Sequence, residues 1–427
     1  MKIGGDFRIR ENWDKNVTSL NDSTPNTERH YQRYRTRLWT QISPTEDIDI
    51  NVRLTWEFFN WCLPAANGLR DTNFDEALFD NLNVVWKNTF GLPNKLTVGR
   101  QDFAGKSGVG DAQFGDGWLF FEGTPLDGSR TIFFDAVRDT YVWKDAAGKA
   151  VSSLDLVYIH TEARVDDVIE PFNTQNRYVM EQDQDGILVY FKNASIKRTQ
   201  IDAYFSFVTE TPSQNFANGY NDEVYTFGGR IEHQFDEAGH WKGRVEAAQQ
   251  LGHREVDGSD AEIVAAGLTS RLTYFLQDKL DQQFRIGYDF LSGNDPDSSK
   301  VGQFYPIWGR WPQWSELITT LYGTESRPGE VTNLHRINLG WTARLCKPVE
   351  LCVDYNLLFA AEAYDDRAGF SSGNLWRGQN VVAVLKYKFS EYVSGHLLGE
   401  VFFPGSFYTD GKDDPSLFVR YDITIAW

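Results

Sequence analysis

Apolar and polar residues alternate strictly along the last stretch of the chain. Every second position from Leu417 to Trp427 is apolar, and the positions between them are Phe418, Arg420, Asp422, Thr424 and Ala426. Side chains on a β-strand point alternately to opposite faces, so this spacing predicts a strand with one apolar face and one mostly polar face. A last strand that ends on an aromatic residue is typical of bacterial outer-membrane barrels, and the last strand of a soluble sandwich is the alternative.

The same period of two recurs along the rest of the chain. It is clearest over 48–58, 201–207, 241–247, 268–274, 284–290 and 336–344. Counting such runs predicts about eighteen strands of roughly 9–14 residues, the length that a tilted strand needs to cross a bilayer. Strands of soluble sandwiches average only about 5–6 residues. The alternation breaks at 79–90, 130–143, 151–162 and 186–193, where strands are less certain.

Short and long connections also alternate. The short ones are 43–47, 91–95, 144–150, 193–199, 235–239, 276–282, 346–349 and 390–392. The long ones, rich in Gly, Asp, Asn and Pro, are 14–29, 61–78, 104–129, 163–185, 210–222, 253–260, 292–332, 361–378 and 404–414. We therefore expect an all-β fold: a transmembrane, antiparallel, up-and-down β-barrel that occupies 1–427 as a single domain, with short periplasmic turns and long extracellular loops.

Composition agrees with a barrel in a membrane. The chain carries 14 Trp, 19 Tyr and 30 Phe, and aromatic residues gather at membrane–water interfaces. No segment approaches the roughly 18–20 consecutive apolar residues of a membrane helix. A closed barrel reconciles a mean hydropathy of -0.46 with a lipid environment, because only alternate residues meet lipid. The expected location is the bacterial outer membrane, with any signal peptide already removed.

Charge and motifs argue against several functions. The formal net charge of -18 disfavours nucleic acid as a partner. The seven histidines are scattered, and the chain contains no HExxH, CxxC, GxSxG, P-loop or Rossmann pattern. Acidic loops such as 293–297 lack the EF-hand pattern and are more often simply solvated. We expect no enzymatic activity, no cofactor and no metal.

Several stretches resemble the alginate-export family of outer-membrane β-barrels. They are GRQDF at Gly99–Phe103, FGDGWLFFEGTPLDGSRTIFFDAVR at Phe114–Arg138, YDFLSGND at Tyr288–Asp295, FYPIWGRWPQWSEL at Phe304–Leu317, TNLHRINLGW at Thr332–Trp341 and EVFFPGSFY at Glu400–Tyr408. The resemblance implies an eighteen-stranded barrel whose Arg-rich constriction passes an anionic polysaccharide. It does not identify the cargo.

The alternation assigns many guanidinium groups to the inward face. An Arg on the lipid face at mid-bilayer costs about 2–4 kcal/mol, so these residues should line the lumen and select anions. The candidates are Arg8, Arg10, Arg33, Arg35, Arg37, Arg53, Arg100, Arg138, Arg244, Arg285, Arg336 and Arg344. Inward acids are also plentiful, so each Arg is equally well explained as half of a cross-strand ion pair. The group on the first two strands has the fewest acids nearby, which favours a net positive patch there.

Two further features have more than one reading. Trp308, Trp311 and Trp314 in the loop 292–332 are candidates for a gate that folds inward or stacks on sugar rings, or they rest on the rim. Cys346 and Cys352 flank a turn and are candidates for a disulfide in the oxidising periplasm, with two free thiols as the alternative. Cys62 has no evident partner.

We therefore expect a porin-like channel that passes an anionic polysaccharide or anionic solutes by passive diffusion. A general diffusion porin, or a barrel that serves as a scaffold for other envelope proteins, is the alternative. The expected partners are membrane lipid and lipopolysaccharide, the anionic polysaccharide or small anions, and periplasmic export or envelope proteins. Nucleic acid is not expected.

Overall fold

The computed structural model of the chain describes residues 1–25, 27–63, 71–74, 77–101, 119, 133–162, 182–212, 221–256, 258–304, 314–322, 331–363 and 371–427. The described strands are β1 (Lys2–Lys15), β2 (Glu28–Ile42), β3 (Ile48–Leu63), β4 (Asp71–Phe74), β5 (Leu78–Lys87), β6 (Asn94–Gln101), β7 (Phe134–Lys144), β8 (Ala150–Thr161), β9 (Gln182–Asn193), β10 (Thr199–Pro212), β11 (Asn221–Gln234), β12 (Trp241–Val256), β13 (Ser259–Phe275), β14 (Gln283–Leu291), β15 (Leu334–Cys346), β16 (Val349–Phe359), β17 (Trp376–Lys388), β18 (Val393–Pro404) and β19 (Ser416–Ala426). The described helices are η1 (Thr89–Gly91) and α1 (Glu316–Tyr322).

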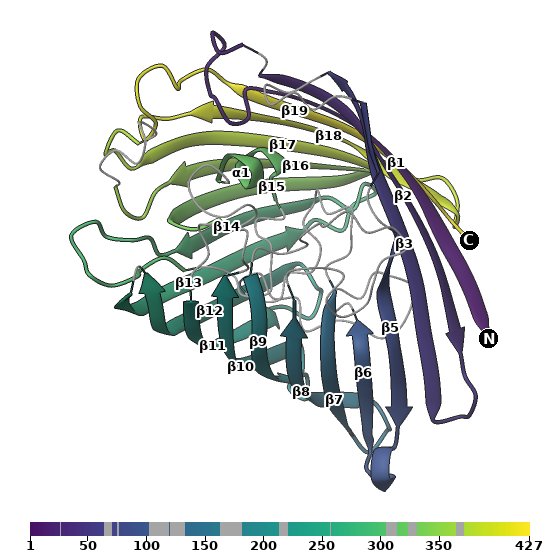
Figure 1. Cartoon of the computed structure of the whole chain (residues 1–427). Coiled ribbons are helices and arrows are strands. Elements are labelled where there is room, and N and C mark those ends of the chain that lie inside the picture. The colour runs from purple at the N-terminus through teal and green to yellow at the C-terminus, as the bar shows by residue number, and fades with distance from the viewer. Residues whose placement is uncertain are drawn as a thin grey trace.

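The strands form one closed antiparallel barrel (Figure 1). Apart from β4, each strand pairs with its neighbours in sequence, so that β3 pairs with β5, and β1 closes the ring by pairing with β19. The short strand β4 pairs with β3 as an addition to the wall. The remaining strands make the wall, which confirms the predicted count of eighteen. Strands β5, β7, β8 and β9 also form where the alternation is weak.

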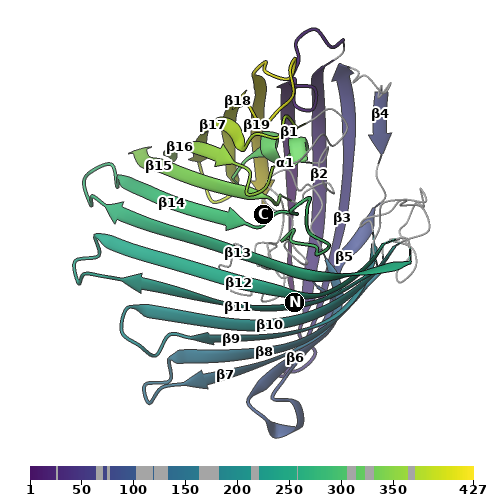
Figure 2. The ribbon, with the colours of Figure 1, turned by 90° about the vertical axis from the view of Figure 1, so that its left-hand side faces the viewer.

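The two rims differ as predicted. Both termini lie at the rim with short turns, since Lys2 pairs with Gln41 just before the turn 43–47 (Figures 1 and 2). Side chains stabilise these turns: Asp236 accepts hydrogen bonds from the backbone N–H groups of His240 and Trp241, which holds the pKa of its carboxyl well below the usual range. The predicted loop 253–260 is wrong, because β12 and β13 leave only two residues between them.

Burial in the barrel is the reverse of burial in a soluble protein. In β19, Leu417, Val419 and Tyr421 are exposed on the outside, whereas Arg420 and Asp422 are buried inside. The same holds around the wall, where the exposed large apolar residues include Leu38, Trp56, Val98, Val137, Ile187, Phe227, Val245, Ile286, Leu339 and Leu397. An apolar outer surface around a polar interior is what a bilayer requires of a barrel.

Apolar residues also pack inside the barrel, toward the end that carries the long loops. Leu334, Phe402 and Phe418 point inward from their strands and pack with α1 and with Leu119. The sequence predicts a mostly polar inner face, and the loop residues explain this apolar part of it because they supply apolar partners inside the wall. Among the described residues, no helix has the length and apolarity to cross a membrane.

Candidate functional site: a basic lumen

Five guanidinium groups lie together on the inner face of β1 and β2. We call Arg8, Arg10, Arg33, Arg35 and Arg37 the arginine patch, and all five side chains are largely buried in the barrel. Three carboxylates form ion pairs with the patch. These are Asp6 with Arg35 at 3.0 Å and Arg37 at 2.6 Å, Glu57 with Arg33 at 2.9 Å and Arg8 at 3.7 Å, and Asp422 with Arg10 at 2.6 Å and Arg8 at 4.0 Å. Guanidiniums therefore outnumber these carboxylates.

Strand register sets like charges opposite one another in the arginine patch. Arg8 lies directly across from Arg35, and Arg10 lies directly across from Arg33. Like charges at directly opposed positions are destabilising. Within the described part of the chain, Nε and Nη2 of Arg8 also find no hydrogen-bond acceptor. The patch is thus a place where added negative charge would be favourable.

On the adjacent wall, from β3 to β8, arginines lie next to carboxylates instead of next to other arginines. Each of three buried arginines there bonds to a carboxylate on a neighbouring strand. The pairs are Arg53 Nε–Asp80 Oδ1 at 2.7 Å, Arg100 Nη2–Asp135 Oδ2 at 2.8 Å and Arg138 Nε–Asp155 Oδ1 at 2.9 Å. Arg53 and Arg100 each use two nitrogens on their partner, a geometry that suits the planar guanidinium. We call this region the paired wall, because each of these three buried arginines has a carboxylate partner.

Arg53 and Arg138 point into the lumen. Arg100 and its partner Asp135 lie on the same side of the sheet as the exposed Val98 and Val137, so the prediction that Arg100 lines the lumen is wrong.

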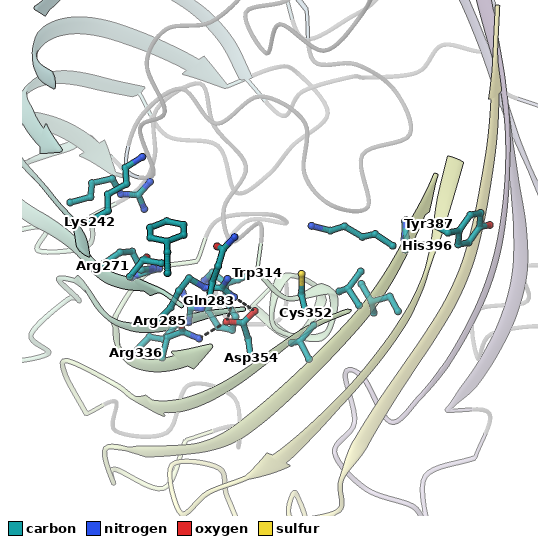
Figure 3. Close-up of a pocket in the computed structure, with 18 of the residues that line it drawn as sticks. Lys242, Arg271, Gln283, Arg285, Trp314, Arg336, Cys352, Asp354, Tyr387 and His396 are labelled. Atoms are coloured by element: carbon teal, nitrogen blue, oxygen red, sulfur yellow. Dashed lines mark hydrogen bonds and ion pairs between the residues drawn. The ribbon is translucent and has the colours of Figure 1, made fainter. Parts of the chain in front are cut away.

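A cavity of about 820 Å³ opens in the lumen between β11 and β19 (Figure 3). Its charged lining residues are Lys242, Arg244, Arg271, Arg285, Arg336 and Lys386, against Glu232, Asp354 and Asp422. Basic groups therefore predominate. Asp422 also contacts Arg10, so the cavity adjoins the arginine patch.

The lining groups differ in how firmly they are held. Arg285 bonds to Asp354 at 3.1 Å, with about a quarter of each side chain exposed to the cavity. Arg336 is buried and donates to Asp289 at 2.7 Å. Arg244 lies directly across from Arg271, a second pair of opposed guanidiniums. In Figure 3, Lys242 and Arg271 face the cavity from one side, and His396 lies on the other.

Helix α1 lies inside the barrel and is fixed there by polar contacts. The carboxylate of Glu400, on β18, accepts hydrogen bonds from the hydroxyl of Ser315 and from the backbone N–H of Glu316 at 2.9 Å. Glu316 in turn pairs with Arg420 of β19 at 2.6 Å. We call these contacts the helix latch. Arg420 lies on the polar face that the alternation predicts, but the sequence gives no sign of the helix.

Trp314, just before α1, is buried and lines the cavity with its ring 4.1 Å from the Arg336 guanidinium. Of the two readings of the loop 292–332, this part folds inward. Trp308 and Trp311 lie outside the described residues.

A β-bulge in β17 gives Arg377 a position that the alternation of the sequence does not predict. Leu358 pairs with Gly378 and Phe359 pairs with Trp376, so Arg377 faces no residue on β16 and its side chain turns inward. Its guanidinium lies 3.9 Å from the ring centre of Phe407 and 4.6 Å from that of Tyr322 in α1. A residue carried by a bulge cannot be assigned to a face from spacing alone.

The candidate disulfide does not form. Cys346 and Cys352 are both free thiols, because the tight turn pairs Cys346 with Val349 and places Cys352 across from Thr342. The two cysteines therefore do not face each other. Arg344 also lies at the short-turn rim, half exposed and paired with Asp281 at 2.7 Å, away from the buried arginines.

Comparison with known proteins gives a family and a fold. The family model described as Alginate export matches residues 167–421. No curated protein matches the chain.

Solved outer-membrane proteins share the barrel. OccAB4 of Acinetobacter baumannii aligns over 100% of this chain and 99% of its own, with a TM-score of 0.59 and 11% identity. OpdK of Pseudomonas aeruginosa, solved with vanillate, aligns over 100% of this chain and 99% of its own, with a TM-score of 0.58 and 8% identity. OccD3 (OpdP) of the same organism aligns over 100% of this chain and 91% of its own, with a TM-score of 0.57 and 10% identity. At such low identity the likeness concerns the fold.

Proposed function

This chain belongs to the alginate-export family and forms an outer-membrane channel, and on that premise we propose that it passes an anionic polysaccharide or smaller anionic solutes by passive diffusion. The observation that carries the proposal is the excess of guanidinium over carboxylate in the arginine patch. A ring or patch of fixed positive charge attracts anions and repels cations in a pore. Family and fold point to a channel rather than to an enzyme.

Two adjoining regions of the wall act together in this proposal. The cavity beside β11–β19 concentrates anions, since six of its nine charged lining residues named above are basic. The arginine patch contacts carboxylates of the passing chain, because a guanidinium pairs with a carboxylate through two parallel hydrogen bonds. Arg8 is the foremost candidate for this contact, since its two nearest carboxylates lie at 3.7 Å and 4.0 Å.

Single-channel recording in a planar bilayer tests the proposal. We expect a reversal potential that reports anion selectivity, and block of the current by an acidic oligosaccharide such as an oligouronate. A neutral oligosaccharide of equal length is the control and should block less. Anion selectivity without block by the acidic oligosaccharide would leave a general anion porin. No selectivity, or no conductance, would contradict the proposal.

The segment 314–322 serves as the gate in the same proposal. Replacing Glu400 with Leu removes the acceptor of the helix latch, and we expect larger or more variable single-channel conductance as α1 leaves its place. Glu400→Gln keeps an oxygen acceptor and is the matched control, with conductance close to that of the unmodified protein. Equal conductance for the two variants would exclude α1 as a barrier.

A further inference from the structure

A second constellation lies on the outer face of the barrel, away from the lumen. Glu11 of β1, His30 of β2 and Cys62 of β3 point outward, near the ends of their strands where the long loops begin. One nitrogen, one sulfur and one carboxylate oxygen of these residues all lie within 4.8 Å of one another. Among the described residues, no other group of three or more His, Cys, Asp or Glu side chains converges in this way.

A β-bulge brings Cys62 into this group. Tyr31 pairs with Trp61 and His30 pairs with Leu63, so Cys62 is the extra residue on β3 and faces no residue of β2. Bulges redirect a side chain and often accompany functional sites. Because of this bulge the thiol lies beside His30 near the end of β3, where it remains exposed.

A second layer of side chains orients Glu11. The amide of Gln32 donates to Glu11 Oε2 at 2.8 Å, while the other carboxylate oxygen faces His30 Nε2. The carbonyl oxygen of Gln32 accepts hydrogen bonds from the Tyr34 hydroxyl at 2.9 Å and from Asn60 Nδ2 at 3.1 Å. These two donors fix which end of the Gln32 amide meets Glu11. Metal ligands are typically held by such supporting hydrogen bonds.

We propose that Glu11, His30 and Cys62 form a zinc-binding site on the outer face of the barrel. Zn²⁺ accepts sulfur, nitrogen and oxygen ligands together at about 2.0–2.3 Å, which places neighbouring ligand atoms about 3–4 Å apart. Small side-chain rotations achieve this from the present spacing. Ca²⁺ and Mg²⁺ prefer oxygen ligands alone, so a thiol and an imidazole do not suit them.

The site is open to an entering ion. About a third of the His30 and Glu11 side chains is exposed, and Cys62 is exposed. Three protein ligands leave one tetrahedral position for water. A bound ion would tie β1, β2 and β3 together beside the loops that leave them. This role is independent of the channel proposed above.

Metal binding to the full-length protein in detergent micelles tests the site. After treatment with a chelator and dialysis against Zn²⁺, we expect one zinc per chain by elemental analysis. With Co²⁺ as a probe, we expect the absorption band that arises from a thiolate bound to cobalt. Cys62→Ser should abolish this band and weaken zinc binding by about 10-fold or more. Cys346→Ser, another exposed thiol, is the matched control and should change neither.

Two further variants separate a ligand role from a folding effect. His30→Gln and Gln32→Ala should each weaken zinc binding, the second by about 10–100-fold as for supporting residues elsewhere. The shift in gel mobility on heating reports whether each variant still forms the barrel. Zinc absent from the unmodified protein would overturn the proposal, and so would a cobalt–thiolate band that survives in Cys62→Ser.

Discussion

Two neighbouring parts of the lumen wall use arginine in opposite ways. In the paired wall each guanidinium meets one carboxylate, as Arg53 meets Asp80 with both side chains almost wholly buried. In the arginine patch Arg8 faces Arg35 across the strands, and five guanidiniums contact three carboxylates. Both regions bury Arg side chains, but β1 and β2 carry them at alternate positions, whereas a strand of the paired wall carries only one.

The difference shows that the function of an inward Arg is set by its cross-strand partner. A buried pair with matched geometry satisfies both charges and holds two strands in register. An opposed pair of guanidiniums concentrates positive charge, which an anion in the lumen would offset. Stability and selectivity should therefore respond to mutation in opposite ways in the two regions.

The largest expected effect is on the stability of the paired wall. Asp80→Asn leaves the buried Arg53 without its counter-charge, and loss of one partner of a buried pair costs about 3–5 kcal/mol. The free energy of unfolding of the barrel in micelles, followed by tryptophan fluorescence in denaturant, measures this. Anion selectivity should change little. The double variant Arg53→Met with Asp80→Leu removes both charges and should recover most of the loss, so equal destabilisation of single and double variants would contradict the pairing.

Mutation of the arginine patch should change the anion selectivity of the channel more than the free energy of unfolding of the barrel. Arg8→Gln removes a guanidinium that faces Arg35, so we expect anion selectivity to fall while the free energy of unfolding changes by less than about 1 kcal/mol. The reversal potential in a salt gradient measures the first, and denaturant unfolding the second. Arg138→Gln, on the paired wall, is the matched control and should be the more destabilised of the two.

Salt should weaken the selectivity of the patch. The screening length falls from about 10 Å at 0.1 M to about 3 Å at 1 M salt, so a mobile anion senses the fixed charges less. Reversal potentials measured at the same concentration ratio but rising total salt should approach the non-selective value. The unfolding free energy should vary less, because buried pairs are screened less than exposed ones. Selectivity that is constant across this range would indicate that another feature selects the ions.

The smallest effect is expected at the rim. Arg344 and Asp281 form an exposed ion pair, and such pairs contribute about 0–1 kcal/mol. Arg344→Gln should therefore leave both unfolding and selectivity nearly unchanged in the same two measurements. A clear loss of selectivity would extend the functional charge from the arginine patch to the periplasmic mouth.

Most of the barrel is predictable from spacing alone. The alternation from Leu417 to Trp427 and its repeats give the strands, their faces and their number, because lipid imposes a period of two on every strand. Inward Arg residues follow from the same rule. The rule fails at Arg377, where one extra residue in β17 shifts the pairing. It fails also for α1, a short helix whose position depends on Glu400 and Arg420 from strands far along the chain.

The sequence by itself therefore determines that this protein is a barrel and, where the alternation is regular, which side chains face lipid or lumen, since those properties depend on local spacing. Only the tertiary structure decides which Arg has a carboxylate across from it, because register brings together residues as distant as Arg10 and Asp422. It also decides that Cys346 and Cys352 stay apart, and that apolar loop residues fill part of the interior. These outcomes depend on pairing between strands, which no single strand encodes.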